Sequence, residues 1–357
     1  MTAEPRVRGI GTAAPHADID AQQGRTLAHA MAPALSGSQL DTLYRDAGVA
    51  HRATVLGAEG IQMQLLEPPG GHGMSTSERL KLFMAAAVDL GACSAGRALA
   101  EASLSPAQVT HLVTVTCTGA QSPGVDQGLI ERLGLSPDIS RTNIGFMGCH
   151  GAMNGLAVAA SFAAANPSAV VLVTCVEICS LHYLAGTERW DQQVANAIFA
   201  DGSGSVVIAA GGDGPVIRGF GSRIFPNTAE LMQWTIGEYG FEMTLSRRVP
   251  GVIKRGIGDW IDQWLASMGY ARADIEGWGV HPGGRDILEG VRRGLDLPDS
   301  ALAASRHVLE THGNMSSGSV LWVLDALLDA GASGLVVALA FGPGLVGEAM
   351  LLDVSGA

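Results

Sequence analysis

Hydrophobic positions along the chain fall into two kinds of stretch. Short runs rich in β-branched residues occupy 111–117, 169–178 and 205–211, where the sequence is "HLVTVTC", "AVVLVTCVEI" and "SVVIAAG". Such runs are typical of strands that are buried on both faces of a sheet. Alanine-rich apolar stretches of helical length lie between several of them. The pattern predicts a layered α/β structure.

Two helices have clear end signals. The segment "STSE" has the form of a capping box, so a helix should begin near Thr76 and run toward Ala100, after a Gly/Pro-rich loop at 67–75. A second helix is predicted over 151–165, "GAMNGLAVAASFAAA", which Asn166 and Pro167 would end.

The second part of the chain repeats the first in four segments. In chain order the pairs are "HLVTVTCTGAQSPG" with "GWGVHPGG", "GFMGCHGAMNGL" with "THGNMSSGSVLW", "SAVVLVTC" with "SGLVVALAFG", and "GSGSVVIAAG" with "VGEAMLLDVSG". Cys117 and Cys149 are 32 residues apart, and His281 and Asn314 are 33 residues apart. We therefore expect two similar halves, 1–212 and 213–357, packed face to face with a site at their seam.

Composition narrows the class of protein. Hydrophobic residues make up 47% of the chain and charged residues only 16%, so most of the chain must be interior. The net charge of −12 argues against a nucleic-acid binder or a polybasic membrane binder. The densest basic segment is "RRVPGVIKR" at 247–255. It is either a solvated surface stretch or a binding cluster for an anionic substrate.

Localisation signals are absent from the printed sequence. No run approaches eighteen uninterrupted apolar residues, and no basic segment followed by an apolar one opens the chain. The five cysteines form no CxxC pair. We therefore expect reduced thiols in a cytoplasmic protein, without a metal site.

Cys149 is a candidate nucleophile. It lies at the start of the predicted 151–165 helix, where free N–H groups and the helix dipole would lower the pKa of its thiol. The alternative is a small buried hydrophobic residue. His150 follows directly, but neighbouring residues on a helix point about 100° apart, so His150 should have a structural role and the base should come from elsewhere.

Two polar residues of the second half are candidate partners of Cys149. His281 ends the apolar segment "WGVH" and precedes Pro-Gly-Gly, which places it at the carboxyl end of a strand, where α/β proteins form their sites. Asn314 precedes "MSSGSVLW" and is either a helix cap or the counterpart of Cys149 in the repeat. The loop 341–348, "FGPGLVGE", lacks the GK[ST] ending of a phosphate-binding loop.

Taken together, "GFMGCHGAMNGL", "AIFADGSGSVVI", "GVHPGG", "GNMSSGSVLWVLD" and "FGPGL" resemble the type III polyketide synthases, the chalcone synthase-like family, over residues 75–357. The resemblance implies a thiolase-like αβαβα five-layer fold, a homodimer and a catalytic triad of Cys149, His281 and Asn314. It implies malonyl-CoA and an acyl-CoA starter as substrates, with no cofactor, nucleic acid or membrane insertion. The substrate-binding positions that it implies are Phe199, Cys117, Cys179, His182, Met243, Ser316, Gly342, Pro343 and Gly344.

The implied reaction is acyl transfer followed by repeated condensation. A cysteine thiolate accepts the starter from its CoA thioester. Malonyl-CoA loses CO₂, and a histidine N–H and an asparagine amide stabilise the enolate, which attacks the acyl-cysteine. The chain finally cyclises to an alkylpyrone, an alkylresorcinol or a related polyphenol.

The implied pocket departs from the plant enzymes, which have threonine where this chain has Cys117, Cys179 and His182. Soft walls with few hydrogen-bond donors favour an aliphatic starter. His182 could supply a donor, and Trp234 could close the pocket to long chains. For the CoA phosphates, Arg45 or Arg52 is a candidate.

Three alternatives stay open. Papain-like proteases share the order Cys…His…Asn, but their C-G-[SA]-C-[WY] signature is missing here. A ketoacyl-ACP synthase III-like enzyme would share fold and triad, but we expect motifs closer to H-Q-x-N and GNTSA in such an enzyme. A non-catalytic acyl-binding relative is disfavoured by the intact triad.

Overall fold

A computed structural model of the protein describes residues 4–66 and 73–355, so the first six residues of the loop expected at 67–75 lie outside the described residues. The largest sheet has nine strands. Their order across the sheet is β11 (Ile275–Val280), β12 (Leu335–Gly342), β13 (Val346–Asp353), β8 (Val216–Ile224), β1 (Arg6–Ala13), β7 (Asp201–Ala209), β6 (Val170–Ile178), β4 (His111–Thr116) and β5 (Ser140–Gly145).

This sheet consists of two parts with the same internal order. In the first part β4 is parallel to β6, and β7 and β1 follow as antiparallel neighbours. In the second part β11 is parallel to β12, and β13 and β8 follow in the same way. A single pairing, Arg6 with Val216, joins the two parts. The predicted boundary near residue 212 lies in the connection between β7 and β8.

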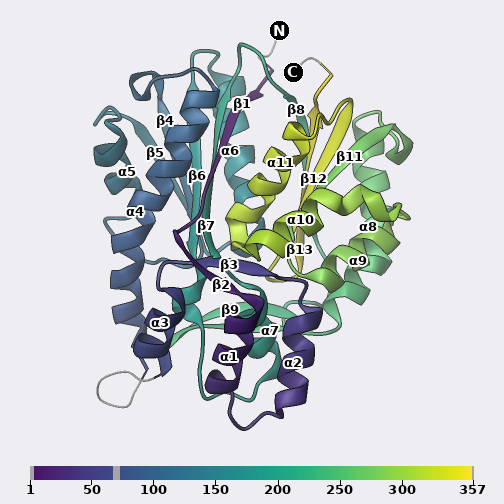
Figure 1. The fold of residues 1–357 in the computed structure, drawn as a ribbon. Helices are drawn as coiled ribbons and strands as arrows, with labels where there is room; N and C mark the ends of the chain where they lie inside the picture. The colour runs from purple at the N-terminus through teal and green to yellow at the C-terminus, as the bar shows by residue number, and fades with distance from the viewer. Residues whose placement is uncertain (1–3, 67–72, 356–357) are drawn as a thin grey trace.

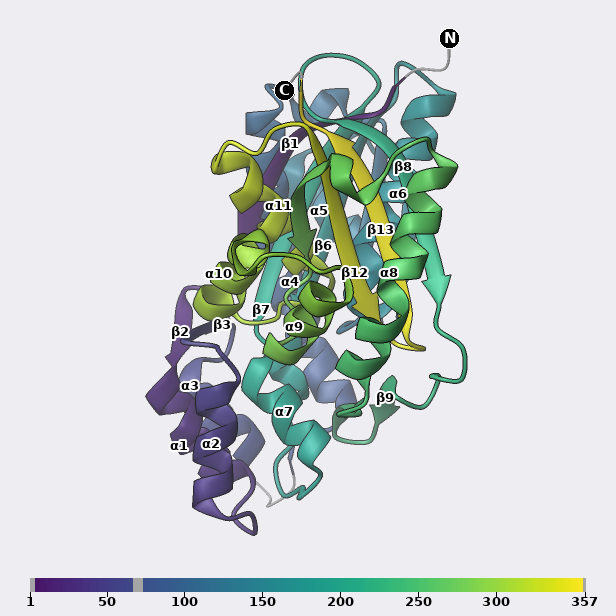
Figure 2. The same cartoon turned by 90° about the vertical axis from the view of Figure 1, so that its right-hand side faces the viewer.

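Helices form three layers around the two parts of the sheet (Figure 1). The central layer contains α6 (Gly151–Ala165) and α11 (Ser319–Asp329), and α4 (Thr76–Glu101) and α5 (Val125–Leu133) cover the outer face of the first part. Figure 2 shows α8 (Val249–Ser267) and α9 (Arg285–Gly294) over the second part, with α10 (Ala303–His312) beside them. Helix, sheet, helix, sheet and helix make five layers, which confirms the predicted thiolase-like fold.

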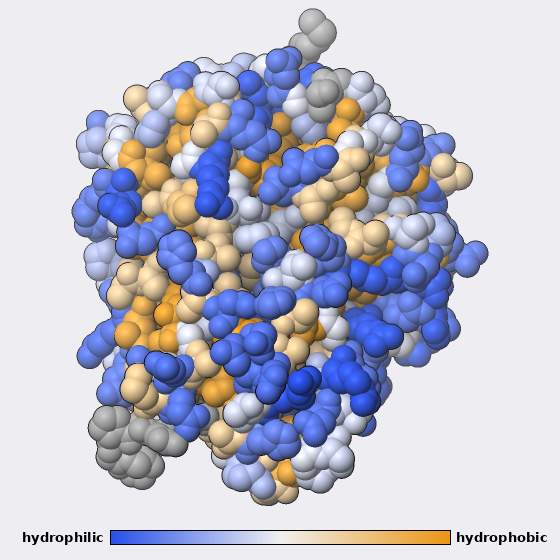
Figure 3. Space-filling view, viewed as in Figure 1, coloured by the Kyte–Doolittle hydropathy of each residue, from blue (hydrophilic) through white to orange (hydrophobic). Residues whose placement is uncertain are grey.

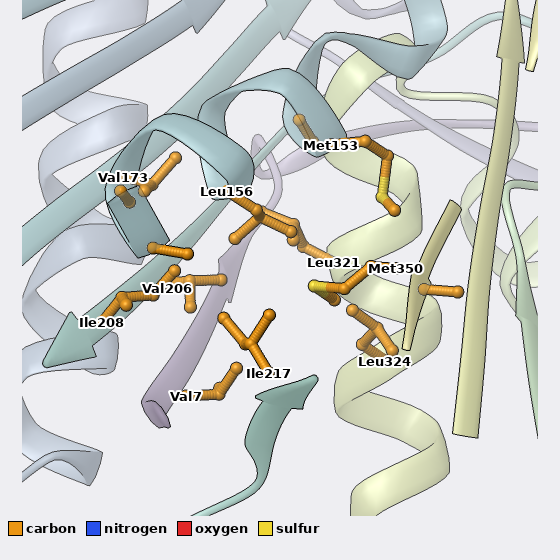
Figure 4. Close-up of a cluster of buried hydrophobic side chains, with 14 of the residues drawn as sticks. Val7, Met153, Leu156, Val173, Val206, Ile208, Ile217, Leu321, Leu324 and Met350 are labelled. Carbon is orange, nitrogen blue, oxygen red and sulfur yellow. The ribbon is translucent and has the colours of Figure 1, made fainter. Parts of the chain in front are cut away.

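The central core lies between the two parts of the sheet (Figure 4). Leu156 of α6 and Leu321 of α11 are both at most 1% exposed, and they pack with Val206 of β7 and Met350 of β13. Burying one such side chain stabilises the fold by about 1.5–3 kcal/mol. Because α6 is rich in alanine and glycine, it fits closely against strands on both sides.

The long helix α4 begins at the predicted capping box, in which Ser75 and Glu78 bond reciprocally. Gly11 of β1 lets this helix approach closely, because a Cβ at Gly11 would lie less than 3.0 Å from the carbonyl oxygen of Ser94. Among the described helices, α4 alone has the length and apolar composition to cross a membrane. Its apolar face belongs to a core cluster with β4, β6 and β7, as in the core helix of a globular protein. The molecular face in Figure 3 has scattered hydrophobic patches among polar ones.

A further group of short elements closes one end of the five layers, at the bottom of Figure 1. Its buried residues form one cluster that includes Cys149, Cys179, Phe199 and Met243. The elements are β2 (Ala17–Asp20), α1 (Ala21–Met31), α2 (Gly37–Asp46), β3 (His51–Thr54), α3 (Gly57–Ile61), α7 (Trp190–Ile198) and the hairpin of β9 (Met232–Gly237) and β10 (Gly240–Leu245).

Candidate active site

Cys149 lies in a short 3₁₀ turn, Gly148–His150, that leads directly into α6. The turn is sharp, since Phe146 and Gly148 have φ values of 56° and 76°. Non-glycine residues rarely adopt such left-handed conformations, and where they do they concentrate at functional sites. The thiol is 7% exposed, at the amino end of α6, where the sequence predicted it.

The predicted lowering of the Cys149 pKa is wrong for this structure. Burial raises the pKa of the thiol to about 12, because a thiolate loses its hydration in the interior. Hydrogen bonds from the side chains of Ser316 and Asn314 favour the thiolate but do not outweigh burial. The negative charge of Glu177 raises the pKa further. Cys149 is therefore a neutral thiol at pH 7 in the absence of substrate.

Asn314 lies beside Cys149 and is not the cap of α11, whose first residue is Ser319. Its backbone pairs with the strand end at Phe199, accepting from Ala200 N–H at 2.9 Å and donating to Ile198 at 2.8 Å. The side-chain oxygen accepts the Ser316 N–H at 2.9 Å. The amide nitrogen of Asn314 in turn donates to the sulfur of Cys149.

His281 follows β11 and is held by its own N–H, which donates to the Leu339 carbonyl at 2.7 Å. Its ring is 1% exposed, and neither ring nitrogen has a partner among the described residues. Burial, and secondarily the neighbouring His150, lowers the pKa of His281 to about 3. The imidazole is therefore neutral at pH 7, with one free donor and one free acceptor.

His150 is hydrogen-bonded within its own helix. Its Nδ1 pairs with Asn154 Oδ1 at 2.9 Å, one helical turn further along α6. Burial lowers the pKa of this imidazole, so His150 is also neutral. The structural role expected from its position next to Cys149 agrees with these contacts.

A cavity of about 330 Å³, counted with its opening, lies over Cys149. Six of the substrate-binding positions implied by the resemblance lie on its wall: Cys117, Cys179, Phe199, Met243, Ser316 and Pro343. The wall also includes Trp234, which the sequence analysis placed at the pocket, and three residues that it did not name: Thr118, Gly148 and Met232. Met232 has no signal in a single sequence, because only the fold brings β9 over the cavity.

His182, Gly342 and Gly344 are not on the cavity wall. His182 uses both ring nitrogens, since Nε2 donates to the Thr118 carbonyl at 2.8 Å and Nδ1 accepts the Phe241 N–H at 3.1 Å. Its ring also stacks on Phe241 with the ring centres 4.1 Å apart. His182 therefore holds the β9–β10 hairpin, and its ring nitrogens are not free to supply the donor that the sequence analysis considered as an exception.

Glu177 is a buried carboxylate that the sequence analysis missed. It ends β6 behind the cavity wall and is 0% exposed. It accepts hydrogen bonds from Cys117 N–H at 3.0 Å and from Thr118 Oγ1 at 2.6 Å, and Ser317 also donates to it. Burial raises its pKa, and these donors oppose the rise. The sequence did contain a signal for it, because Glu177 is the only charged residue in the apolar run "AVVLVTCVEI".

Comparison with known families decides the class of this site. The profile described as "Chalcone and stilbene synthases, N-terminal domain" matches residues 28–212, and the corresponding C-terminal profile matches residues 220–355. The chain belongs to the chalcone and stilbene synthase family. It is a type III polyketide synthase, an acyltransferase of the decarboxylative condensation class, and the match favours this interpretation over the protease and ketoacyl-ACP synthase III alternatives.

Curated relatives and solved structures agree with this family. The synthase is 35% identical to the α-pyrone synthesis polyketide synthase-like Pks18 of Mycobacterium tuberculosis, over 78% of this chain and 73% of the relative. It is also 35% identical to 1,3,6,8-tetrahydroxynaphthalene synthase of Streptomyces peucetius, over 71% of this chain and 70% of that one. The crystal structure of PKS-I from the brown alga Ectocarpus siliculosus superposes with a TM-score of 0.90 at 29% identity, covering 99% of both chains.

The two arginines that were candidates for binding the CoA phosphates differ in how exposed they are. Arg52 is 4% exposed, donates to the Asn196 carbonyl and lies over the rings of Tyr44 and Tyr183, so it is unavailable to a phosphate. Arg45 is exposed and pairs with Asp46 at 3.1 Å. Over residues 4–66 and 73–355, no three His, Cys, Asp or Glu side chains are arranged to hold a metal ion.

The buried, neutral state of His182 predicts a pH-dependent stability. Burial lowers its folded-state pKa to about 3, whereas an unfolded histidine titrates near 6.5. Below pH 6.5 the unfolded state binds a proton that the folded state does not, so stability falls as pH falls. Replacing His182→Gln should shrink the difference in unfolding free energy between pH 7 and pH 5 by about 2 kcal/mol.

Urea unfolding of the wild type and the variant at both pH values measures this difference. His16→Gln, at an exposed position, is the control and should leave the difference unchanged. An equal pH dependence in the wild type and His182→Gln would contradict a neutral buried His182.

Proposed function

We propose that Cys149, His281 and Asn314 act as the catalytic triad of the synthase. The observation that carries this proposal is a buried thiol that contacts Asn314 and lies in the same seam as a histidine with two unpartnered nitrogens. In this mechanism the neutral His281 accepts the thiol proton as Cys149 attacks the starter thioester. The C–S bond to CoA then breaks, and the proton passes from His281 to the departing CoA thiolate. The oxygen of that thioester gains negative charge in a site where a neutral amide and an imidazole N–H are the available donors.

Extension uses the same two donors. Malonyl-CoA loses CO₂ when its thioester oxygen binds near Asn314 and His281, because their N–H groups stabilise the enolate that forms. The enolate carbon attacks the acyl group on Cys149 and releases the thiol. Repetition lengthens the chain, which then cyclises to an alkylpyrone, an alkylresorcinol or a related polyphenol.

In this proposal the exposed arginine and lysine side chains of 247–255 bind CoA. Arg247 and Arg248 come four and five residues after Met243 of the cavity wall, and both are exposed, as are Lys254 and Arg255. Such a cluster attracts the phosphates of CoA, which a chain of net charge −12 would otherwise repel. The substrates are then malonyl-CoA and an acyl-CoA starter, without a cofactor.

The wider organisation follows the family. Residues 1–212 and 213–357 form the two thiolase-like halves, with the nucleophile in the first and both donors in the second. The synthase works as a cytoplasmic homodimer, without nucleic acid or membrane insertion.

The proposed nucleophile can be tested by locating the acyl group. Incubation with an acyl-CoA should acylate Cys149, because it is the thiol that Asn314 contacts at the cavity wall. Peptide mass spectrometry should find the adduct on the Cys149 peptide and none after Cys149→Ala. The exposed Cys93 provides the control, since Cys93→Ala should still be acylated on Cys149. An adduct on Cys117 or Cys179 in the wild type would refute the assignment.

If Asn314 stabilises the enolate, replacing it should affect chain extension much more than starter loading. Asn314→Ala removes one donor to the enolate, which should lower the rate of malonyl-CoA decarboxylation by about 10²–10³ while starter loading remains detectable. Asn314→Asp should be at least as slow, because its carboxylate repels the developing charge. Release of CO₂ and acylation of Cys149 are measured separately. Decarboxylation near the wild-type rate in Asn314→Ala would limit this residue to a structural role.

The cavity wall predicts an aliphatic starter. A phenolic hydroxyl without a partner costs about 1–3 kcal/mol, whereas each buried CH₂ contributes about 0.8 kcal/mol. Three possible donors on the wall are engaged, since Trp234 Nε1 donates to the Cys117 carbonyl at 2.7 Å, Thr118 Oγ1 donates to Glu177, and Ser316 Oγ pairs with Cys117 Sγ at 3.0 Å. We expect kcat/KM for hexanoyl-CoA to exceed that for coumaroyl-CoA by about tenfold or more.

Chain length should depend on Trp234, whose ring occupies one wall of the small cavity. Trp234→Ala should raise kcat/KM for lauroyl-CoA relative to hexanoyl-CoA, because removing the indole makes room for more methylenes. Tyr239→Ala, an exposed aromatic position between β9 and β10, serves as the control.

The outcome that would contradict the predicted aliphatic starter is equal or better use of coumaroyl-CoA by the wild type. It would show that the wall supplies a donor after all.

A further inference from the structure

His150 is buried at the centre of the site, yet none of the proposed chemical steps uses it. Its side chain is 2% exposed, its Nδ1 is bound to Asn154, and it is absent from the cavity wall. A polar side chain that is placed beside a nucleophile and excluded from the substrate requires another explanation.

The imidazole of His150 packs on the backbone of Gly342, at the end of β12 in the second half of the chain. A Cβ added to Gly342 would lie less than 3.0 Å from Cδ2 of His150 and 3.2 Å from its Nε2. Only a residue without a side chain lets the ring come so close. The contact therefore depends on both residues together.

A second contact of the same kind lies next to the first. A Cβ added to Gly148 would come within 3.0 Å of Cδ of Pro343. Two residues of the nucleophile turn, Gly148 and His150, thus fit against two successive residues at the end of β12, Pro343 and Gly342. Cys149 lies between them, so any shift of this contact moves the thiol.

The same strand β12 also holds His281. Leu339 of β12 accepts the His281 N–H at 2.7 Å, and β11 and β12 are parallel neighbours up to that point. The strand that receives the His150 ring is therefore the strand that positions the proposed base.

We propose that His150 is a positioning residue, whose ring locks the turn that carries Cys149 onto Gly342 and so keeps the thiol aligned with His281 across the seam. The inference rests on the roles proposed for Cys149 and His281. The requirement is for a flat ring at position 150 and for no side chain at position 342.

Single-turnover acylation of Cys149 by hexanoyl-CoA, followed by mass spectrometry of the whole protein, tests this role. Gly342→Ala should slow acylation by about tenfold or more, because misplacing a reacting group by about 1 Å can cost up to about 10²-fold. The double variant His150→Ala with Gly342→Ala should be faster than Gly342→Ala alone, since removing the ring makes room for the new methyl group.

Two further variants decide the question if Gly342→Ala does not fold. His150→Phe keeps a flat ring and should acylate close to the wild-type rate, whereas His150→Ala should be slow. Gly96→Ala, at a helical position with no atom within 4 Å of the added Cβ, is the control for the glycine substitution. Thermal midpoints show that each variant is folded at the assay temperature.

The outcomes separate the two proposals. A wild type that is not acylated on Cys149 overturns the proposed function and this inference with it. A wild type that is acylated, together with His150→Ala at the same rate, overturns the positioning role alone. So does a double variant that is no faster than Gly342→Ala.

Discussion

Burial of α6 and α11 between the two parts of the sheet is the constraint on which the rest of the site depends. Both helices are apolar around much of their surface, and their side chains share one core with strands from both parts. Packed in this way, the turns that precede the two helices meet. Cys149 and Asn314 come from these two turns, so the core that stabilises the fold also brings the thiol and the amide together.

The same burial governs the electrostatics of the site. It keeps the Cys149 thiol protonated and the His281 imidazole neutral, because either charge would lose its hydration in the interior. Cys149 and His281 therefore do not form a thiolate–imidazolium ion pair at pH 7. The proposed mechanism relies on the free N–H of the His281 imidazole to bind the oxygen of an incoming acyl thioester.

We attribute the selectivity of the synthase for its starter to the peripheral elements. The β9–β10 hairpin contributes Met232, Trp234 and Met243 to the cavity wall, although it pairs with no strand of the large sheet. It is held by side chains from other elements, including His182 at Phe241 and Gln192 Oε1, which accepts the Met243 N–H at 3.1 Å. Synthases with the same core can therefore differ in starter and chain length, because a hairpin of this kind can change its side chains without disturbing α6 or α11.

The sequence by itself determined the layers, the repeat and the identity of the polar residues at the seam. The layers can be predicted because hydrophobic positions recur with the period of the helix or strand, and helix ends can be predicted because their caps are local. The repeated order of segments places Cys149 opposite Asn314, whatever the neighbouring side chains are. Only the tertiary structure decided that Arg52 and His182 are fully engaged, that Glu177 lies behind Cys117, and that the Cys149 pKa is raised. Each of these depends on the partners and the hydration that a side chain has once distant segments pack around it, and no local pattern in the chain records that.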